Sequence, residues 1–116
     1  MGKTILAIDD ENSMLAFYQA ALAKYGDVRT ARGMKVARSL YGGVDLVILD
    51  CYMEEEHDTL QNRIVELKRV APVLICSGVL DPGVQAIGQA NGATGYWLKG
   101  TDVNGLHTLI HAVFGG

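Results

Sequence analysis

The sequence has few of the features that would place it in a membrane or a disulfide-rich secreted protein. Its 116 residues include only two cysteines, Cys51 and Cys76. No apolar run approaches the roughly 20 residues that a membrane-spanning helix needs. Each cysteine lies at the end of an apolar run, where a small buried thiol is the ordinary interpretation. Residues 1–4 lead directly into a strand-like segment, without the apolar stretch and cleavage site of a signal peptide. We therefore expect a cytoplasmic protein with reduced cysteines and no contact with a membrane.

Positive charge is also scarce, because the formal net charge is -3. Nucleic-acid-binding domains normally carry a basic face, so we expect no direct binding to nucleic acid. The basic residues are scattered among acids and apolar residues, and we interpret them as a solvated surface. These residues include Lys24, Arg29, Arg32, Lys35, Arg38, Arg63, Lys68 and Arg69. Hydrophobic residues make up 49% of the chain, which is enough for residues 1–116 to form one folded domain.

Five apolar, strand-like segments alternate with five helix-like segments. Strict alternation of this kind predicts a parallel sheet with helices on both faces. The run at 44–49 is almost continuously apolar, which is typical of a central strand that helices cover on both sides. The first helix-like segment ends at Gly26, a residue that favours helix termination. The predicted strands are 4–8, 28–31, 44–49, 73–76 and 94–98.

Capping residues mark the starts of three later helices. Asp58, with Gln61 three residues later, resembles a capping box in which Asp replaces the usual Ser or Thr. Asp81 comes directly before Pro82, which predicts an N-cap followed by proline at the first helical position. Asp102 is the predicted N-cap of the last helix.

Polar residues follow four of the predicted strands, where the functional crevice of a parallel α/β sheet lies. Asp9 and Asp10 follow the first strand, Asp50 the third, Ser77 the fourth and Lys99 the fifth. Three nearby carboxylates repel one another unless a cation joins them, and oxygen ligands suit a hard cation such as Mg²⁺. An ammonium and a hydroxyl can bind phosphate oxygens, and a carboxylate can form an acyl phosphate. Any one of these carboxylates could be a helix cap, but caps alone do not explain the whole set.

Four segments carry a resemblance to a known family: ILAIDDE (5–11), DLVILD (45–50), PVLICSG (72–78) and GATGYWLK (92–99). In this order and spacing, they resemble the receiver domains of two-component response regulators over essentially the whole chain. The resemblance implies a flavodoxin-like, doubly wound α/β fold. It would have a five-stranded parallel sheet in the order 2-1-3-4-5 and five helices.

The same resemblance implies a function and a set of site residues. A histidine kinase or phosphotransfer protein would donate a phosphoryl group to Asp50 with the help of Mg²⁺. Such a domain is a signalling substrate that catalyses its own phosphorylation and dephosphorylation, and not a turnover enzyme. The implied metal ligands are Asp10, Asp50 and the backbone carbonyl of Tyr52, with Asp9 in support. The implied phosphoryl-binding and switch residues are Ser77, Lys99 and Tyr96.

The sequence departs from the family at two places. The family usually has Met-Pro and a glycine turn after the phosphoacceptor, whereas this chain has the acidic segment 54–58. We interpret that segment as a solvated helix entry, and an altered approach of the partner or metal is the alternative. Gly100 follows Lys99 where the family usually has a cis proline, so no cis peptide is expected.

Two other functions remain open. One is a receiver-like protein-interaction module that works without phosphorylation. The other is a small phosphatase with an aspartyl intermediate. Such phosphatases place the nucleophile directly after the first strand with a second Asp two residues later, whereas Asp9 and Asp10 are adjacent.

Overall fold

The computed structural model describes residues 2–53 and 58–115 as a sheet with helices on both sides. The sheet has five strands in the order β2-β1-β3-β4-β5, and all neighbouring strands are parallel. Both the α/β class and the strand order predicted from the sequence are confirmed. The strands are β1 (Lys3–Ile8), β2 (Gly26–Ala31), β3 (Leu46–Asp50), β4 (Val73–Ser77) and β5 (Gly95–Leu98).

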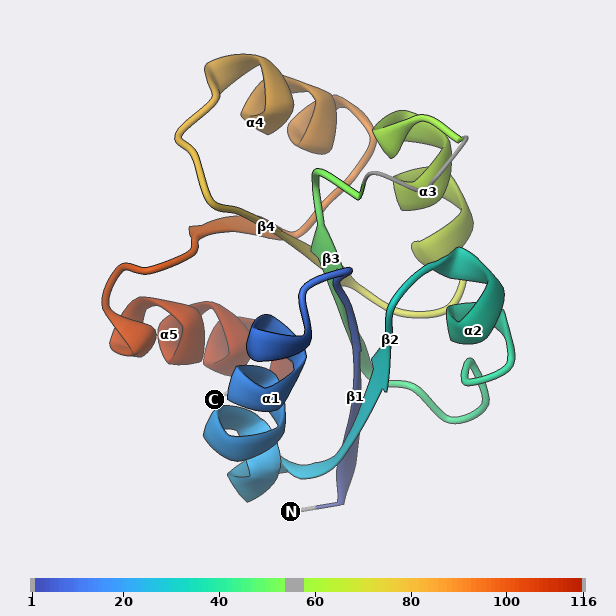
Figure 1. Cartoon of the computed structure of the whole chain (residues 1–116), viewed down its shortest axis with the longest axis vertical. Helices are drawn as coiled ribbons and strands as arrows, with labels where there is room; N and C mark the ends of the chain where they lie inside the picture. Colours follow the sequence, from blue (N-terminus) through green and yellow to red (C-terminus); the bar gives the residue numbers. More distant parts are fainter. Residues whose placement is uncertain (1, 54–57, 116) are drawn as a thin grey trace.

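Five α-helices cover the two faces of the sheet. Helices α1 and α5 pack on one face, and α2, α3 and α4 pack on the other (Figure 1). Within the described part of the chain, no helix has the length and apolar character needed to cross a membrane. The helices are α1 (Asn12–Leu22), α2 (Met34–Arg38), α3 (Leu60–Leu67), α4 (Pro82–Ala90) and α5 (Val103–Phe114), and a short 3₁₀ turn (Ala23–Tyr25) follows α1.

The central strand β3 is buried along its whole length. Its side chains alternate between the two cores: Val47 and Leu49 pack with α2, α3 and α4, whereas Leu46 and Ile48 pack with α1 and α5. This double burial explains why the sequence is almost continuously apolar there.

The two cysteines are backbone neighbours but lie in different cores. The Cys51 N–H donates to the Cys76 carbonyl over 3.0 Å. The Cys51 side chain packs in the core under α2, α3 and α4, and that of Cys76 packs in the core under α1 and α5. Because the sheet separates the two sulfur atoms, they cannot form a disulfide with each other. Both residues are free and buried, as the sequence predicted.

Two of the predicted helix caps are confirmed and one is wrong. The Asp81 side chain accepts hydrogen bonds from the backbone at the start of α4, and Asp102 does the same for α5. Helix α3 is instead capped by Thr59, whose hydroxyl accepts from the Asn62 N–H over 3.0 Å. The carboxylate of Asp58 lies one position too early to be the N-cap and accepts from the Thr59 N–H. Either side chain can cap a helix, so the sequence pattern could not choose between them.

Of the two departures from the family's usual sequence, the structure describes the one at Gly100. Residues 54–57 of the acidic segment lie outside the described residues. Gly100 has a positive φ of 81°, and no cis peptide bond occurs in the described residues. The absence of cis geometry after Lys99 is therefore confirmed, and the turn uses a conformation that favours glycine.

Candidate functional site

Three carboxylates meet at the carboxyl edge of the sheet. Asp50 is the last residue of β3, and Asp9 follows β1 directly. Asp9 and Asp50 are buried, whereas Asp10 is partly exposed. One carboxylate oxygen from each of the three residues lies within 4.8 Å of the others. The sequence predicted this convergence from the strand ends alone.

Lys99 joins the cluster from the end of β5. Its Nζ lies 2.6 Å from Asp9 Oδ2 and 3.0 Å from Asp50 Oδ1, and its side chain is only 8% exposed. Glu11, at the mouth of the site, has a carboxylate oxygen 3.9 Å from the same nitrogen. A single ammonium therefore faces several acids, which leaves an excess of negative charge that a cation would neutralise.

Burial and the neighbouring charges shift the pKa of both Asp50 and Lys99. Burial, followed by repulsion from Asp9, raises the pKa of Asp50 to about 6, although Lys99 and the Tyr52 N–H act in the opposite direction. Burial alone would lower the pKa of Lys99, but its bonds to Asp9 and Asp50 hold that pKa above its ordinary value. Lys99 therefore stays charged at neutral pH, whereas ionising Asp50 costs free energy in the folded chain.

Ser77 and Tyr96 share one hydrogen-bond acceptor. The Ser77 hydroxyl donates to the Val79 carbonyl over 2.9 Å, and the Tyr96 hydroxyl donates to the same carbonyl over 2.7 Å. The Val79 N–H also donates to Ser77 Oγ over 3.2 Å. Both predicted switch residues therefore hold the loop between β4 and α4.

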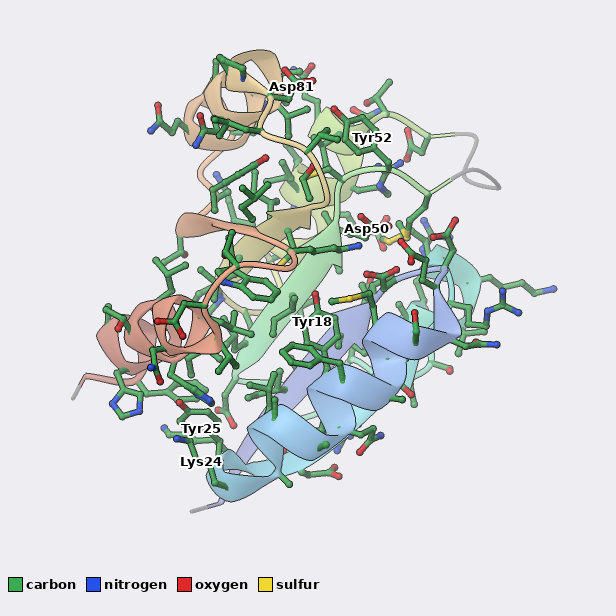
Figure 2. All side chains as sticks on the ribbon, turned by 60° about the vertical axis from the view of Figure 1, so that its left-hand side comes forward. Tyr18, Lys24, Tyr25, Asp50, Tyr52 and Asp81 are labelled. Carbon is green, nitrogen blue, oxygen red and sulfur yellow. The ribbon has the colours of Figure 1, made fainter. Side chains whose placement is uncertain are left out.

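Tyr52 links the loop after β3 to the start of α4. Its N–H donates to Asp50 Oδ1 over 3.4 Å, and its hydroxyl donates to Asp81 Oδ2 over 2.7 Å. In Figure 2, the labelled side chains of Tyr52 and Asp81 both lie above Asp50. The sequence pointed only to the Tyr52 carbonyl, through the resemblance, and to Asp81 only as a helix cap. The hydrogen bond between the Tyr52 and Asp81 side chains depends on how closely the loop after β3 approaches the start of α4. No pattern in the sequence predicts that distance.

One further residue near the site was assigned to the surface, and that assignment is wrong. Arg63 on α3 is only 4% exposed. A signal was present, because position 63 lies three residues after Leu60 and four before Leu67, on the apolar face of the helix. Its guanidinium donates to the backbone carbonyls of Cys51 and Asp58.

Comparison with solved structures identifies the fold. A response regulator from Thermotoga maritima matches over 100% of both chains with a TM-score of 0.86 and 21% sequence identity. The BeF3-activated DrrB receiver domain, also from Thermotoga maritima, matches over 100% of both chains with a TM-score of 0.88 and 18% identity. The chain has the fold of response-regulator receiver domains. The resemblance seen in the sequence is therefore confirmed at the level of the fold.

A third receiver-fold neighbour carries a modified site. It is a response regulator protein from Burkholderia pseudomallei with a phosphorylated aspartic acid, a calcium ion and citrate. It matches 92% of this chain and 65% of its own with a TM-score of 0.79 and 22% identity.

Comparison by sequence gives a match to part of a longer curated protein. No family model matches the chain. A curated relative, the "Probable cyclic di-GMP phosphodiesterase" of Vibrio cholerae, is 31% identical over 113 residues. The match covers 93% of this chain and 26% of that relative, so the chain spans about a quarter of the relative's length.

Proposed function

We propose that residues 1–116 form one receiver domain of a cytoplasmic two-component system, and that Asp50 accepts a phosphoryl group from a histidine kinase or phosphotransfer protein. The observation that carries this proposal is the position of Asp50. It ends the central strand of a receiver fold, beside Asp9 and Asp10, and its carboxylate accepts a hydrogen bond from Lys99 over 3.0 Å. A solved neighbour with a phosphorylated aspartic acid supports the same chemistry.

The acid cluster fits a magnesium ion. Oxygens of Asp9, Asp10 and Asp50 lie close enough to surround a cation, and Mg²⁺ prefers carboxylate and carbonyl oxygens. Asp10, Asp50 and the Tyr52 carbonyl would bind it directly, whereas Asp9 already pairs with Lys99 and would support the site. When bound, Mg²⁺ would neutralise charge on the carboxylates and on the incoming phosphoryl group.

In the proposed transfer, an ionised oxygen of Asp50 attacks phosphorus as the bond from phosphorus to the donor's imidazole nitrogen breaks. The imidazole then takes up a proton from water. Lys99 and the Ser77 hydroxyl contact the oxygens of the transferred group, where charge must be offset. The pKa of about 6 leaves most of Asp50 ionised at neutral pH. Attack of water on phosphorus later releases phosphate and regenerates the carboxylate, so the domain acts as a reversible switch.

The proposed switch begins at the shared carbonyl of Val79. If Ser77 turns its hydroxyl toward the phosphoryl group, it gives up its bond to this carbonyl and leaves Tyr96 as the remaining hydroxyl donor. The β4–α4 loop then has fewer restraints, which shifts the balance between two surfaces around α4 and β5. The downstream protein would bind one of these two surfaces.

A Tyr96→Phe variant tests this coupling. The wild-type chain should show a clear change in hydrogen exchange over residues 78–82 when beryllofluoride occupies the site. In the variant, exchange there should be fast beforehand and should change little, because one of the two donors to Val79 is already gone. Tyr41→Phe, which removes a hydroxyl bonded to Glu66, is the matched control. An equal response in wild type and Tyr96→Phe would contradict the coupling.

The direct test of phosphotransfer is the intact mass of the chain after incubation with acetyl phosphate. We expect one phosphoryl adduct with Mg²⁺ and none when EDTA removes divalent ions. No adduct in a folded chain that binds Mg²⁺, with a histidine kinase also failing as donor, would contradict the proposal. That result would favour a receiver-like interaction module that works without phosphorylation.

A further inference from the structure

Arg63 is a buried cation to which the mechanism above assigns no role. It lies on α3 and is 4% exposed. Among residues 2–53 and 58–115, no carboxylate lies within ion-pair distance of its guanidinium. Burying a charge is costly, and two hydrogen bonds to backbone carbonyls offset part of this cost.

The hydrogen bonds of Arg63 reach Cys51, which precedes the acidic segment, and Asp58, which is its last residue. One terminal nitrogen of Arg63 donates to the Asp58 carbonyl over 2.8 Å, and the other donates to the Cys51 carbonyl over 3.2 Å. The planar guanidinium holds its two terminal nitrogens in a fixed geometry, so the two carbonyls are held relative to each other. The family usually has a proline and a glycine turn in this segment, and this chain has neither.

The carbonyl of Cys51 belongs to the same peptide group as the N–H of Tyr52. In a trans peptide these two groups point in opposite directions, so fixing one fixes the other. The carbonyl accepts from Arg63, and the N–H donates to Asp50 Oδ1 over 3.4 Å. The Cys51 N–H is separately held by the Cys76 carbonyl on β4. Arg63 therefore contacts one end of a peptide whose other end contacts the candidate phosphoacceptor.

We propose that Arg63 is a positioning residue of the phosphoacceptor site: it holds the Cys51–Tyr52 peptide so that the Tyr52 N–H faces the carboxylate of Asp50, one of the proposed ligands of the cation. The inference rests on the function proposed above.

The test is a calorimetric titration of the metal-free chain with Mg²⁺, for wild type, Arg63→Met and Arg63→Lys. Loss of an outer-sphere partner typically weakens metal binding about 10–100-fold, and we expect a change of that size in Arg63→Met. Arg63→Lys keeps the positive charge but has one nitrogen in place of the two terminal nitrogens of the guanidinium, so we expect an intermediate loss of Mg²⁺ affinity. Arg38→Met is the matched control, because it removes an exposed guanidinium that pairs with Glu66. Its Mg²⁺ affinity should equal that of wild type.

The outcomes separate the inference from the proposed function. A purely structural Arg63 would lower the melting temperature and leave Mg²⁺ affinity unchanged in the folded chain, and that result would overturn the inference alone. A wild-type chain that binds no Mg²⁺ would overturn the proposed cation site, and the inference with it. If Arg63→Met does not fold, the comparison of Arg63→Lys with wild type decides.

Discussion

Replacing Asp50 by asparagine is expected to abolish the phosphoryl adduct and, in the same variant, to stabilise the metal-free chain at neutral pH. The amide cannot form an acyl phosphate, so no adduct should be detectable with acetyl phosphate or with a kinase. The amide is also uncharged, so it removes repulsion from Asp9 while its oxygen can still accept from Lys99. Loss of function and gain of stability therefore have the same electrostatic origin.

The size and the pH dependence of the stabilisation follow from the pKa of Asp50. Folding raises this pKa from 3.8 to about 6, so the folded chain holds more protons than the unfolded chain between these two pH values. The stability of wild type should therefore fall as the pH rises through that window. A pKa change of one unit corresponds to about 1.4 kcal/mol. We therefore expect the free energy of unfolding of Asp50→Asn to exceed that of wild type by about 1–2 kcal/mol at pH values above this window.

Urea unfolding in EDTA across this pH range measures the effect. The difference between Asp50→Asn and wild type should be smallest at the acid end and should level off above the pKa of Asp50. Saturating Mg²⁺ should narrow the difference, because it stabilises only the chain with all three carboxylates. Asp27→Asn, which changes an exposed acid beside Arg29, is the control and should have little effect. A wild-type chain more stable than Asp50→Asn at neutral pH would contradict this account.

The convergence of the site could be predicted because it depends on topology. Once the chain is a parallel sheet with alternating helices, residues after different strands must meet at one edge. Asp9, Asp50 and Lys99 are therefore brought together whatever the details of packing. The fold class could be predicted from the alternation of strand and helix periods alone. The strand order came from the resemblance to receiver domains, because alternation does not fix the order of strands in a sheet.

The contacts that hold the site could not be predicted, because they depend on distances between elements. The bonds from Arg63 to Cys51 and Asp58 require a particular spacing between α3 and the end of β3. The shared use of the Val79 carbonyl by Ser77 and Tyr96 likewise depends on the path of one loop. Alternation and capping patterns describe elements one at a time, and these bonds join one element to another.

Lys99→Met is expected to have the second large effect, on both stability and phosphotransfer. The substitution keeps much of the side-chain volume but leaves the buried carboxylates of Asp9 and Asp50 without their cation. Removing one partner of a buried ion pair typically costs about 3–5 kcal/mol, and we expect a loss near the lower value because Asp50 can take up a proton. Loss of one preorganised group that stabilises transition-state charge typically slows a reaction about 10²–10³-fold, and we expect a similar slowing of transfer from acetyl phosphate.

Mg²⁺ separates the two roles of Lys99. Saturating Mg²⁺ should restore much of the stability of Lys99→Met, because the ion neutralises the same carboxylates. It should not restore the rate of adduct formation, measured by intact mass over time, if the ammonium contacts the phosphoryl group. Lys35→Met, an exposed lysine on α2, is the control for loss of positive charge. Recovery of a wild-type rate with Mg²⁺ would mean that Lys99 only balances the charge of Asp9 and Asp50, and the contact with the phosphoryl group would be wrong.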